Sequence, residues 1–337
     1  MDFSGSHILS IDQFDRSDID HLFSVAESLE PYSLRKKVTR VLEGAILGNM
    51  FFEPSTRTRI SFGAAFNLLG GAVRETSEVG SSSLTKGESL VDTAQVLSGY
   101  SDIIVMRHPE EGSVESFSQA SRVPVINGGD GSNEHPTQAL LDLYTIKKEL
   151  ETNHKTIDGL RIALVGDLKF GRAVHSLSKV LCLYQEVTIN LISPKELRFA
   201  DPYLNSLRKA GVTINEFENL EEGIAEVDII YMTRIQEERF KNNSDAKKYK
   251  GLLSLNEKIY TANCEPNTVI MHPLPRDSRQ GANELDADLN NNPNLAIFRQ
   301  ADNGVVIRMA LFALVLGVVD QIDKTSRDVN WHTSERH

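Results

Sequence analysis

The stretch Phe51-Phe52-Glu53-Pro54-Ser55-Thr56-Arg57-Thr58-Arg59 marks the point where a strand ends and a helix begins. Apolar residues lead into it, and Pro54 ends the strand. Ser55 or Thr56 can then cap a helix that continues, with apolar residues at helical spacing, to about Leu69. A strand that turns directly into a helix is the unit from which parallel α/β sheets are built.

The start of this helix is predicted to bind an anion. Exposed N–H groups and the positive end of the helix dipole attract negative charge there. Arg57 and Arg59 lie in the first turn, where cations oppose the dipole unless an anion arrives. Arginine binds phosphate through two parallel hydrogen bonds, and Ser55, Thr56 and Thr58 add hydroxyl donors. The alternative is an ordinary capped helix with surface arginines, and the two first-turn arginines argue against it.

Composition and charge limit the class of protein. A chain of 337 residues suggests two domains, and a net charge of −11 argues against non-specific nucleic-acid binding and a basic membrane surface. Cys182 and Cys264 cannot form a metal cluster or a disulfide framework, and they suit reduced thiols of the cytosol. The chain shows no signal-peptide pattern and no apolar run of roughly 18 residues. We expect a cytoplasmic protein without nucleic-acid or membrane partners.

Strand and helix patterns alternate in two successive series. They predict an α/β fold with two doubly wound parallel-sheet domains, residues 1–150 and 151–303, joined in a polar segment after residue 150. An apolar helix is expected at about 304–320, and the polar tail 324–337 is expected to fray. Because ligands bind at the carboxyl ends of parallel strands, the active site is expected in the cleft between the domains.

The side chains at the predicted strand ends are rich in hydrogen-bond donors and poor in carboxylates, which suits polyanionic ligands. They are Ser55, Thr56, Arg57, Thr58, Arg107, His135, Gln138, Arg172, Arg234, Gln236 and the Leu274-Pro275 turn. The sequence contains no glycosidase-like carboxylate pair, no nucleophile elbow and no metal-ligand spacing. We therefore expect catalysis by positioning and charge stabilisation, without a metal or cofactor.

The stretch from Val165 to Arg172 has the strand–glycine–helix order of a dinucleotide site. Its glycines, Gly166 and Gly171, are five apart, so the G-x-G-x-x-G spacing is not met. No Gly-Lys-Ser/Thr follows, which excludes a P-loop. This stretch is therefore not expected to bind a nucleotide.

Six motifs, in order, resemble those of aspartate carbamoyltransferase catalytic chains, in the aspartate/ornithine carbamoyltransferase superfamily, and the resemblance covers about residues 7 to 320. Besides the opening stretch they are Met106-Arg107-His108-Pro109, His135-Pro136-Thr137-Gln138, Gly166-Asp167 with Gly171-Arg172, Met232-Thr233-Arg234-Ile235-Gln236, and His272-Pro273-Leu274-Pro275-Arg276. Ornithine enzymes typically carry H-C-L-P at the last motif and lack the loop matched here by Ser82 to Lys86. Arg234 also suits a carboxylate, whereas an ornithine site would want an acid.

The resemblance implies that carbamoyl phosphate and L-aspartate give N-carbamoyl-L-aspartate and phosphate, an early step of pyrimidine synthesis. Residues 1–150 would bind carbamoyl phosphate, with helix 304–320 packed back on them, and residues 151–303 would bind aspartate. Ser55, Thr56, Arg57 and Thr58 would hold the phosphate. The leaving phosphate itself would accept the proton.

The remaining roles also follow from the resemblance. Thr58, Arg107 and His135 would polarise the carbonyl, and Arg107 would also bridge to the phosphate. Gln138 and the Leu274 carbonyl, before Pro275 in a bond that is cis in the family, would orient the carbamoyl NH2. The residues that would hold the two aspartate carboxylates are Arg172, Arg234 and Gln236. The helix dipole at His135 favours a neutral imidazole.

The loop that contains Ser82 and Lys86 implies shared active sites. A Ser/Gly/Lys loop is ordinarily solvated. In this family, however, it reaches into the neighbouring subunit's site, which implies a homotrimer in which Lys86 contacts both substrates. The resemblance also leaves open that regulatory chains bind the trimer and form a larger complex.

Two alternatives and three structural interpretations remain. The chain could act on another amino acid, such as ornithine or an acetylated derivative, or it could be a binding or regulatory paralogue. The intact motif positions argue against the second alternative. His108 and His272 are interpreted as structural residues. Glu53 could pair with Arg57, Arg59 or Arg107, and Arg59 is interpreted as such a structural partner.

Overall fold

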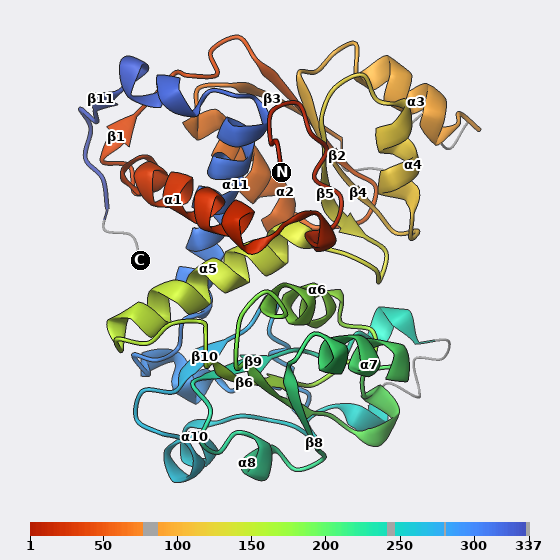
Figure 1. Ribbon diagram of the computed structural model, residues 1–337, viewed down its shortest axis with the longest axis vertical. Helices are drawn as coiled ribbons and strands as arrows, with labels where there is room; N and C mark the ends of the chain where they lie inside the picture. The colour runs from red at the N-terminus through yellow and green to blue at the C-terminus, as the bar shows by residue number, and fades with distance from the viewer. Residues whose placement is uncertain (77–86, 241–246, 280, 335–337) are drawn as a thin grey trace. The chain divides into compact units, whose positions relative to one another are not determined.

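The structure is a computed structural model that describes residues 1–76, 87–240, 247–279 and 281–334 (Figure 1). The chain divides into two compact units, Met1–Leu141 with Asp302–His337, and Asp142–Ala301. Each unit contains its own parallel sheet with helices packed on it, which confirms the predicted α/β class. Ser82 and Lys86 lie outside the described residues.

The first unit is built on a four-stranded parallel sheet in the order β3-β2-β4-β5. The strands are β2 (Ile46–Phe51), β3 (Ala72–Thr76), β4 (Ile103–His108) and β5 (Val125–Asp130). Strands β2, β4 and β5 are almost entirely buried, as expected for a parallel sheet covered on both faces, whereas the edge strand β3 is half-exposed.

Helices cover this first sheet, and α3 and α4 pack side by side (Figure 1). The helices are α1 (Arg16–Ser33), α2 (Thr56–Leu68), α3 (Leu90–Leu97), α4 (Ser113–Ala120) and the later part of α11 (Ile297–Val315). Phe312 of α11 meets Phe62 and Phe66 of α2 edge-on, at centroid distances of 6.0 and 5.0 Å. Arg308 lies 4.6 Å from the centre of the Phe62 ring. The C-terminal helix therefore packs back on the N-terminal unit, as predicted.

The second unit contains a five-stranded parallel sheet in the order β10-β9-β6-β7-β8. The strands are β6 (Arg161–Val165), β7 (Thr188–Ile192), β8 (Thr213–Phe217), β9 (Ile229–Met232) and β10 (Val269–Met271). The helices are α6 (Arg172–Leu181), α7 (Asp201–Lys209), α8 (Leu220–Gly223) and α10 (Glu257–Asn263). The division between the units falls within α5 (Pro136–Thr152) and α11, so both helices belong partly to each unit.

Short 3-10 helices connect these elements: η1 (Ile11–Gln13), η4 (Lys195–Leu197), η5 (Glu237–Arg239), η6 (Lys247–Tyr249), η7 (Ala287–Asn291) and η8 (Val319–Thr325). No single helix among the described residues is long and apolar enough to cross a membrane. The bent pair of α11 and η8 meets the length and composition criteria when the two are taken together.

The C-terminal tail is tied to the N-terminal part of the chain. Strand β11 (Arg327–Asp328) pairs antiparallel with β1 (Lys37–Val38). The Thr39 hydroxyl donates to the Ile322 carbonyl at 3.0 Å, and the Tyr32 hydroxyl donates to Asp323 at 2.9 Å. The expectation of a frayed tail is therefore wrong for Arg327 and Asp328, because backbone pairing and buried hydroxyls hold a segment of polar composition.

Candidate active site

Most of the predicted site residues lie where the strand order of each sheet reverses. In the first sheet the chain runs from β2 outward to β3 and then returns to β4 on the other side. In the second sheet β7 and β8 lie on one side of β6, and β9 and β10 lie on the other. Ligands of open α/β sheets bind at the carboxyl ends of the strands at such reversals. The loops after β2 and β4, and after β6 and β9, are therefore the candidate site segments.

Helix α2 begins as the sequence predicts, with Ser55 as its N-cap. The Ser55 side chain makes no capping hydrogen bond with the described residues, and the first turn contains no acidic residue. The Phe52 N–H donates to the Arg107 carbonyl at 2.8 Å, so the ends of β2 and β4 are held side by side. Thr56 and Arg57 are exposed at this helix start. The arrangement presents N–H, hydroxyl and guanidinium donors to an anion.

An ion pair fixes Arg107 at the end of β4. Its Nε and Nη2 atoms lie 2.8 and 2.7 Å from Oε2 of Glu53, and the two side chains are only 12% and 18% exposed. Of the three arginines that Glu53 could pair with, the structure thus shows Arg107. Arg59 pairs instead with Glu75 at 2.7 Å, and Asn49 donates to both residues. Arg59 therefore has a structural ion pair, as interpreted, but its partner is Glu75 and not Glu53.

His135 is buried at the start of α5, just after β5. The preceding Glu134 is fixed on both sides: its carbonyl accepts the Asp130 N–H at 3.0 Å, and its carboxylate accepts the Ser10 hydroxyl at 3.2 Å. The His135 carbonyl accepts the N–H of Gln138 at 3.0 Å, which starts the helix. His135 and Gln138 are therefore placed by a hydrogen-bonded turn that joins β5 to the start of α5.

His108 has a structural environment, as interpreted from the sequence. Its ring meets Phe52 edge-on at 5.9 Å, and its Nδ1 accepts the Glu110 N–H at 3.1 Å. Burial lowers the pKa of His108, which keeps the ring neutral. A neutral ring that already accepts a backbone hydrogen bond serves to shape the turn after β4.

In the second unit, a close approach joins the ends of β6 and β9. Gly166 has φ +115°, and a Cβ at this position would lie 2.2 Å from the Thr233 carbonyl oxygen, so a side chain is excluded. The Thr233 N–H and hydroxyl both donate to the Val165 carbonyl at 2.8 Å. This contact places the Arg234–Gln236 segment beside the turn that leads to Arg172.

Asp167 connects these two segments, a role that the sequence reasoning missed. Its fully buried carboxylate accepts the Phe170 N–H at 3.0 Å and the Gln236 N–H at 3.1 Å. Helix α6 then begins at Arg172, with Gly171 as an N-cap that has no side chain. The signal was present in the motif itself, because a carboxylate directly after a buried strand needs donors, and loop N–H groups are the nearest ones.

The turn after β10 contains Leu274, which has φ +58°, and the Leu274–Pro275 peptide bond is cis, as the resemblance implied. His272, at the start of the turn, is 1% exposed and hydrogen-bonded on both ring nitrogens. These two hydrogen bonds and the burial of the ring agree with the interpretation of His272 as a structural residue.

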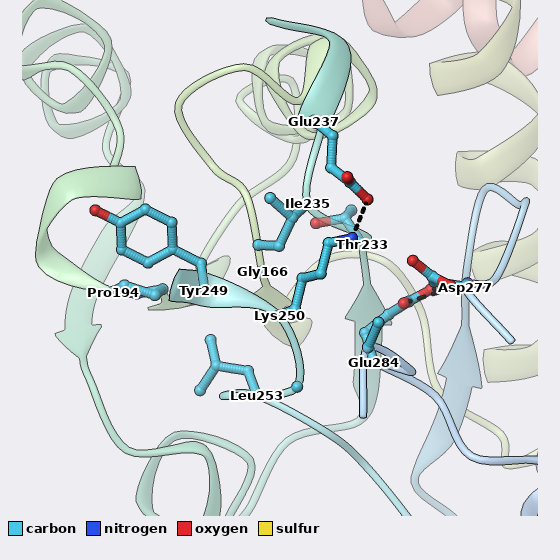
Figure 2. A pocket seen from close by; sticks show the side chains of 12 residues that line it. Gly166, Pro194, Thr233, Ile235, Glu237, Tyr249, Lys250, Leu253, Asp277 and Glu284 are labelled. Carbon is cyan, nitrogen blue, oxygen red and sulfur yellow. Dashed lines mark hydrogen bonds and ion pairs between the residues drawn. The ribbon is translucent and has the colours of Figure 1, made fainter. Parts of the chain in front are cut away.

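A pocket in the second unit lies beside the ends of β6 and β9 (Figure 2). Its lining includes Gly166, Thr233, Glu237, Lys250 and Glu284, and it does not include the predicted ligand-binding residues of this unit. The Lys250 ammonium meets the Glu237 carboxylate at 2.7 Å (Figure 2), and Arg279 pairs with Glu237 and Asp277. The charges of Lys250 and Arg279 therefore largely neutralise those of Glu237 and Asp277 at this pocket.

The structure thus groups the described site residues into two sets, one in each unit. In the first unit, the carboxyl end of β4 and the loops and first helical turns after β2 and β5 carry Ser55, Thr56, Arg57, Thr58, Arg107, His135 and Gln138. In the second unit, the first residue of α6 and the loops after β9 and β10 carry Arg172, Arg234, Gln236, Leu274 and Pro275.

Comparison with known proteins identifies the family. The family model for the aspartate/ornithine carbamoyltransferase carbamoyl-P binding domain matches residues 6–148, and that for the Asp/Orn binding domain matches residues 158–315. The aspartate carbamoyltransferase catalytic subunit of Cellvibrio japonicus is 67% identical over 336 residues, which cover 100% of this chain and 99% of the relative. That of Saccharophagus degradans is 66% identical over 334 residues, 99% of each chain.

Solved structures agree with these relatives. Aspartate transcarbamoylase from Trypanosoma cruzi, in complex with carbamoyl phosphate and aspartate, superposes with a TM-score of 0.85 at 37% identity, over 93% of this chain and 98% of that one. The catalytic subunit of M. Jannaschii aspartate transcarbamoylase gives a TM-score of 0.83 at 41% identity, over 94% and 99% of the two chains. The chain described here belongs to the aspartate/ornithine carbamoyltransferase family.

Proposed function

We propose that this chain transfers the carbamoyl group of carbamoyl phosphate to the amine of L-aspartate, and so forms N-carbamoyl-L-aspartate and phosphate for pyrimidine synthesis. Relatives at 52–67% identity are all named aspartate carbamoyltransferase catalytic subunit. Similar T. cruzi structures hold carbamoyl phosphate with aspartate, or N-(phosphonacetyl)-L-aspartic acid. These names favour aspartate over the ornithine alternative.

The observation that carries the proposal in this chain is the start of α2 beside the fixed Arg107. A phosphate bound there would meet Ser55, Thr56, Arg57 and Thr58 at the positive end of the helix dipole. Because Glu53 holds the Arg107 guanidinium in place, little side-chain freedom is lost when a substrate binds. This site suits the phosphate of carbamoyl phosphate.

Three donors would stabilise the charge that develops during attack by the amine. Thr58 and His135 follow β2 and β5, and Arg107 lies at the end of β4, the strand between them in the sheet. Each donor directed at a developing oxyanion is worth roughly 3–4 kcal/mol in the transition state. Gln138 and the Leu274 carbonyl would orient the carbamoyl NH2, and the departing phosphate would take up the proton.

The second unit would bind aspartate. Arg172 starts α6, where the helix dipole and the guanidinium both favour a carboxylate. Asp167 holds the Gln236 backbone and the turn before Arg172 together, so Arg234 and Gln236 would act from the same place as Arg172. Two guanidinium groups and an amide suit a dicarboxylate better than an amino acid with a cationic side chain.

We further propose a homotrimer with shared sites, in which Ser82 and Lys86 act on the substrates of a neighbouring subunit. Exposed apolar side chains on both sides of that loop in the sequence support an interface: Ile60 of α2 is 56% exposed, and Val91, Val96 and Tyr100, in and just after α3, are 52%, 48% and 68% exposed. Cytoplasmic location and association with regulatory chains belong to the same proposal.

The substrate is tested by a radiolabelled transfer assay, with carbamoyl phosphate supplied together with aspartate or ornithine. We expect product with aspartate alone. Transfer to ornithine, or the absence of any transfer, would contradict the proposed reaction. Shared sites are tested by subunit exchange between Lys86→Ala and Arg57→Ala trimers, each inactive alone. Mixed trimers should recover part of the activity, and verified mixed trimers without recovery would exclude sharing.

A further inference from the structure

A chain of buried polar side chains runs through the second unit behind the turn after β10. It consists of Tyr231, Asp142, Gln300, His272 and Glu284, none of which is more than 7% exposed. The Tyr231 hydroxyl and the Gln300 amide each donate to Asp142 at 2.6 Å. Gln300 in turn accepts the His272 N–H at 2.9 Å, and the His272 ring meets Glu284 at 2.7 Å. Buried polar groups are costly unless they are satisfied, so a chain this continuous fixes its members.

The hydrogen bonds of His272 define its tautomer. Its Nδ1 accepts the Leu274 N–H at 2.8 Å, so Nε2 carries the hydrogen and donates to Oε1 of Glu284. Burial lowers the pKa of His272, in agreement with a neutral ring. A protonated ring could not accept from Leu274, and the opposite tautomer could not donate to Glu284.

Glu284 holds the far end of the same turn. Its two carboxylate oxygens accept the Asp277 N–H at 3.1 and 3.3 Å, and Figure 2 shows Glu284 beside Asp277 on the pocket wall. His272 and Glu284 therefore fix the turn at Leu274 and at Asp277. Leu274 needs such support, because its φ of +58° lies in the left-handed region that side chains other than glycine rarely adopt.

We propose that His272 and Glu284 are positioning residues for the carbamoyl group: together they hold Leu274 so that its carbonyl oxygen accepts a hydrogen bond from the carbamoyl NH2. The inference rests on the proposed function, in which this carbonyl contacts the substrate. Asp142 and Gln300 anchor the His272 backbone to Tyr231 of β9, the strand that continues to Arg234. The turn after β10 and the end of β9 are therefore held by the same set of hydrogen bonds.

A matched pair of substitutions separates positioning from stability. In His272→Asn the amide oxygen replaces Nδ1 and still accepts from Leu274, whereas in His272→Gln the amide nitrogen replaces Nε2 and still donates to Glu284. Each variant loses one buried hydrogen bond, so similar losses of thermal stability are expected. We expect about a 10-fold higher KM for carbamoyl phosphate in the Gln variant and less than a 3-fold change in the Asn variant.

Acetyl phosphate supplies the decisive readout, because it has a methyl group where carbamoyl phosphate has NH2. Its inhibition constant should change less than about 2-fold in His272→Gln, since it makes no hydrogen bond to the Leu274 carbonyl. Tyr231→Phe is the matched control: it removes one hydrogen bond at the other end of the chain and should leave the ratio of the two constants unchanged. Equal weakening of both phosphates in His272→Gln, or equal effects of the Asn and Gln variants, would overturn the proposal.

If His272→Gln does not fold, the Glu284→Gln variant tests the same proposal. Its amide oxygen still accepts from His272, but the Asp277 N–H loses part of its acceptor, so a shift of about 3-fold confined to carbamoyl phosphate is expected. No selective shift would contradict the inference. A wild-type enzyme that fails to carbamoylate aspartate would instead contradict the proposed function, whatever the variants do.

Discussion

Helices α2 and α3 of the first unit begin in opposite ways. At α3 the Ser89 side chain accepts the Asp92 N–H at 3.0 Å, and Asp92 places an acid near the positive end of the dipole. At α2 the N-cap Ser55 makes no such bond with the described residues, and the first turn contains arginine instead of an acid. Helix α3 has a side-chain cap and an acid at its start, whereas the start of α2 has neither among the described residues, and this favours an anion there.

The second unit repeats this difference. Helix α10 has Asn256 as a cap, which accepts the Ile259 N–H at 2.9 Å, and Glu257 in the first turn. Helix α6 has Gly171 as its N-cap, Arg172 as its first residue and no acid in the first turn. Among these four helices, the two starts that lack a side-chain cap and an acid, and carry arginine, follow the strand-order reversals. A helix start that carries arginine and has no side-chain cap and no acid is therefore a candidate anion site.

The largest expected effect comes from Arg57→Ala at the start of α2. Removing a donor that stabilises transition-state charge should lower kcat/KM about 100- to 1,000-fold, while the protein stays folded. Ser89→Ala at the start of α3 is the matched control and should cost about 1 kcal/mol of stability with unchanged kcat/KM. Steady-state kinetics and thermal melts measure both. Comparable kinetic losses in the two variants would contradict a special role of the α2 start in catalysis.

Asp167→Asn should produce the next largest effect, on aspartate alone. The amide can accept only one of the two N–H groups that the carboxylate now accepts, and its own NH2 faces the other. We expect KM for aspartate to rise about 10- to 100-fold, because an unsatisfied buried donor costs roughly 1–3 kcal/mol. KM for carbamoyl phosphate serves as the internal control. An equal rise in both constants would show that Asp167 does not act through the Arg172 and Gln236 segments.

Glu53→Gln should have a smaller effect, on the first unit. The neutral amide leaves the shape intact but weakens the hold on Arg107 by about 1–2 kcal/mol, so kcat/KM should fall about 10-fold. Glu75→Gln, which loosens the structural Arg59 in the same way, is the control and should leave kcat/KM within about 2-fold. Equal losses in both variants would argue against a special role of the Glu53–Arg107 pair.

The smallest expected effect concerns a more exposed ion pair in the second unit. Arg279 lowers the pKa of Asp277 to about 2, although Arg279 itself is 63% exposed. Because the folded pKa is depressed, the pair stabilises the native state above the unfolded value of about 3.9, and this contribution is lost as the pH falls towards 2. Asp277→Asn should cost at most about 1 kcal/mol near pH 7 after screening by solvent.

Urea unfolding of wild type and Asp277→Asn between pH 2 and 7 measures that difference. The two free energies of unfolding should run parallel above about pH 5 and converge below about pH 4. Added salt should shrink the gap further, since the partner guanidinium is exposed. A gap that widened at low pH would contradict the assigned sign.

The sequence predicts the parts of the site that depend on neighbouring residues. The strand end, the helix start and the first-turn arginines of the opening stretch are all local, and the structure contains them where expected. The partner of Glu53 is not local, because it depends on β4 lying beside β2, and the sequence left three arginines open. The role of Asp167 was missed for the same reason, since one of its donors, the Gln236 N–H, lies 69 residues away.

Element boundaries failed where polar residues have distant partners. The last long helix was expected at about 304–320, around the apolar run from Val305 to Val319. It begins at Ile297, since Arg299 pairs with Glu149 at 2.6 Å and Gln300 donates to Asp142. A polar side chain interrupts the apolar pattern from which a helix is predicted. Only its distant partner shows that the helix continues through it.

The pairing of β11 with β1 has a consequence for how the first unit comes apart. The Tyr32 and Thr39 side chains hold residues that lie almost 300 positions later in the chain. Peeling away the last segment therefore exposes the end of α1, and melting α1 releases the last segment. The segment 322–328 and the end of α1 are therefore expected to open together, so a protease that cuts in either one must wait for both to open.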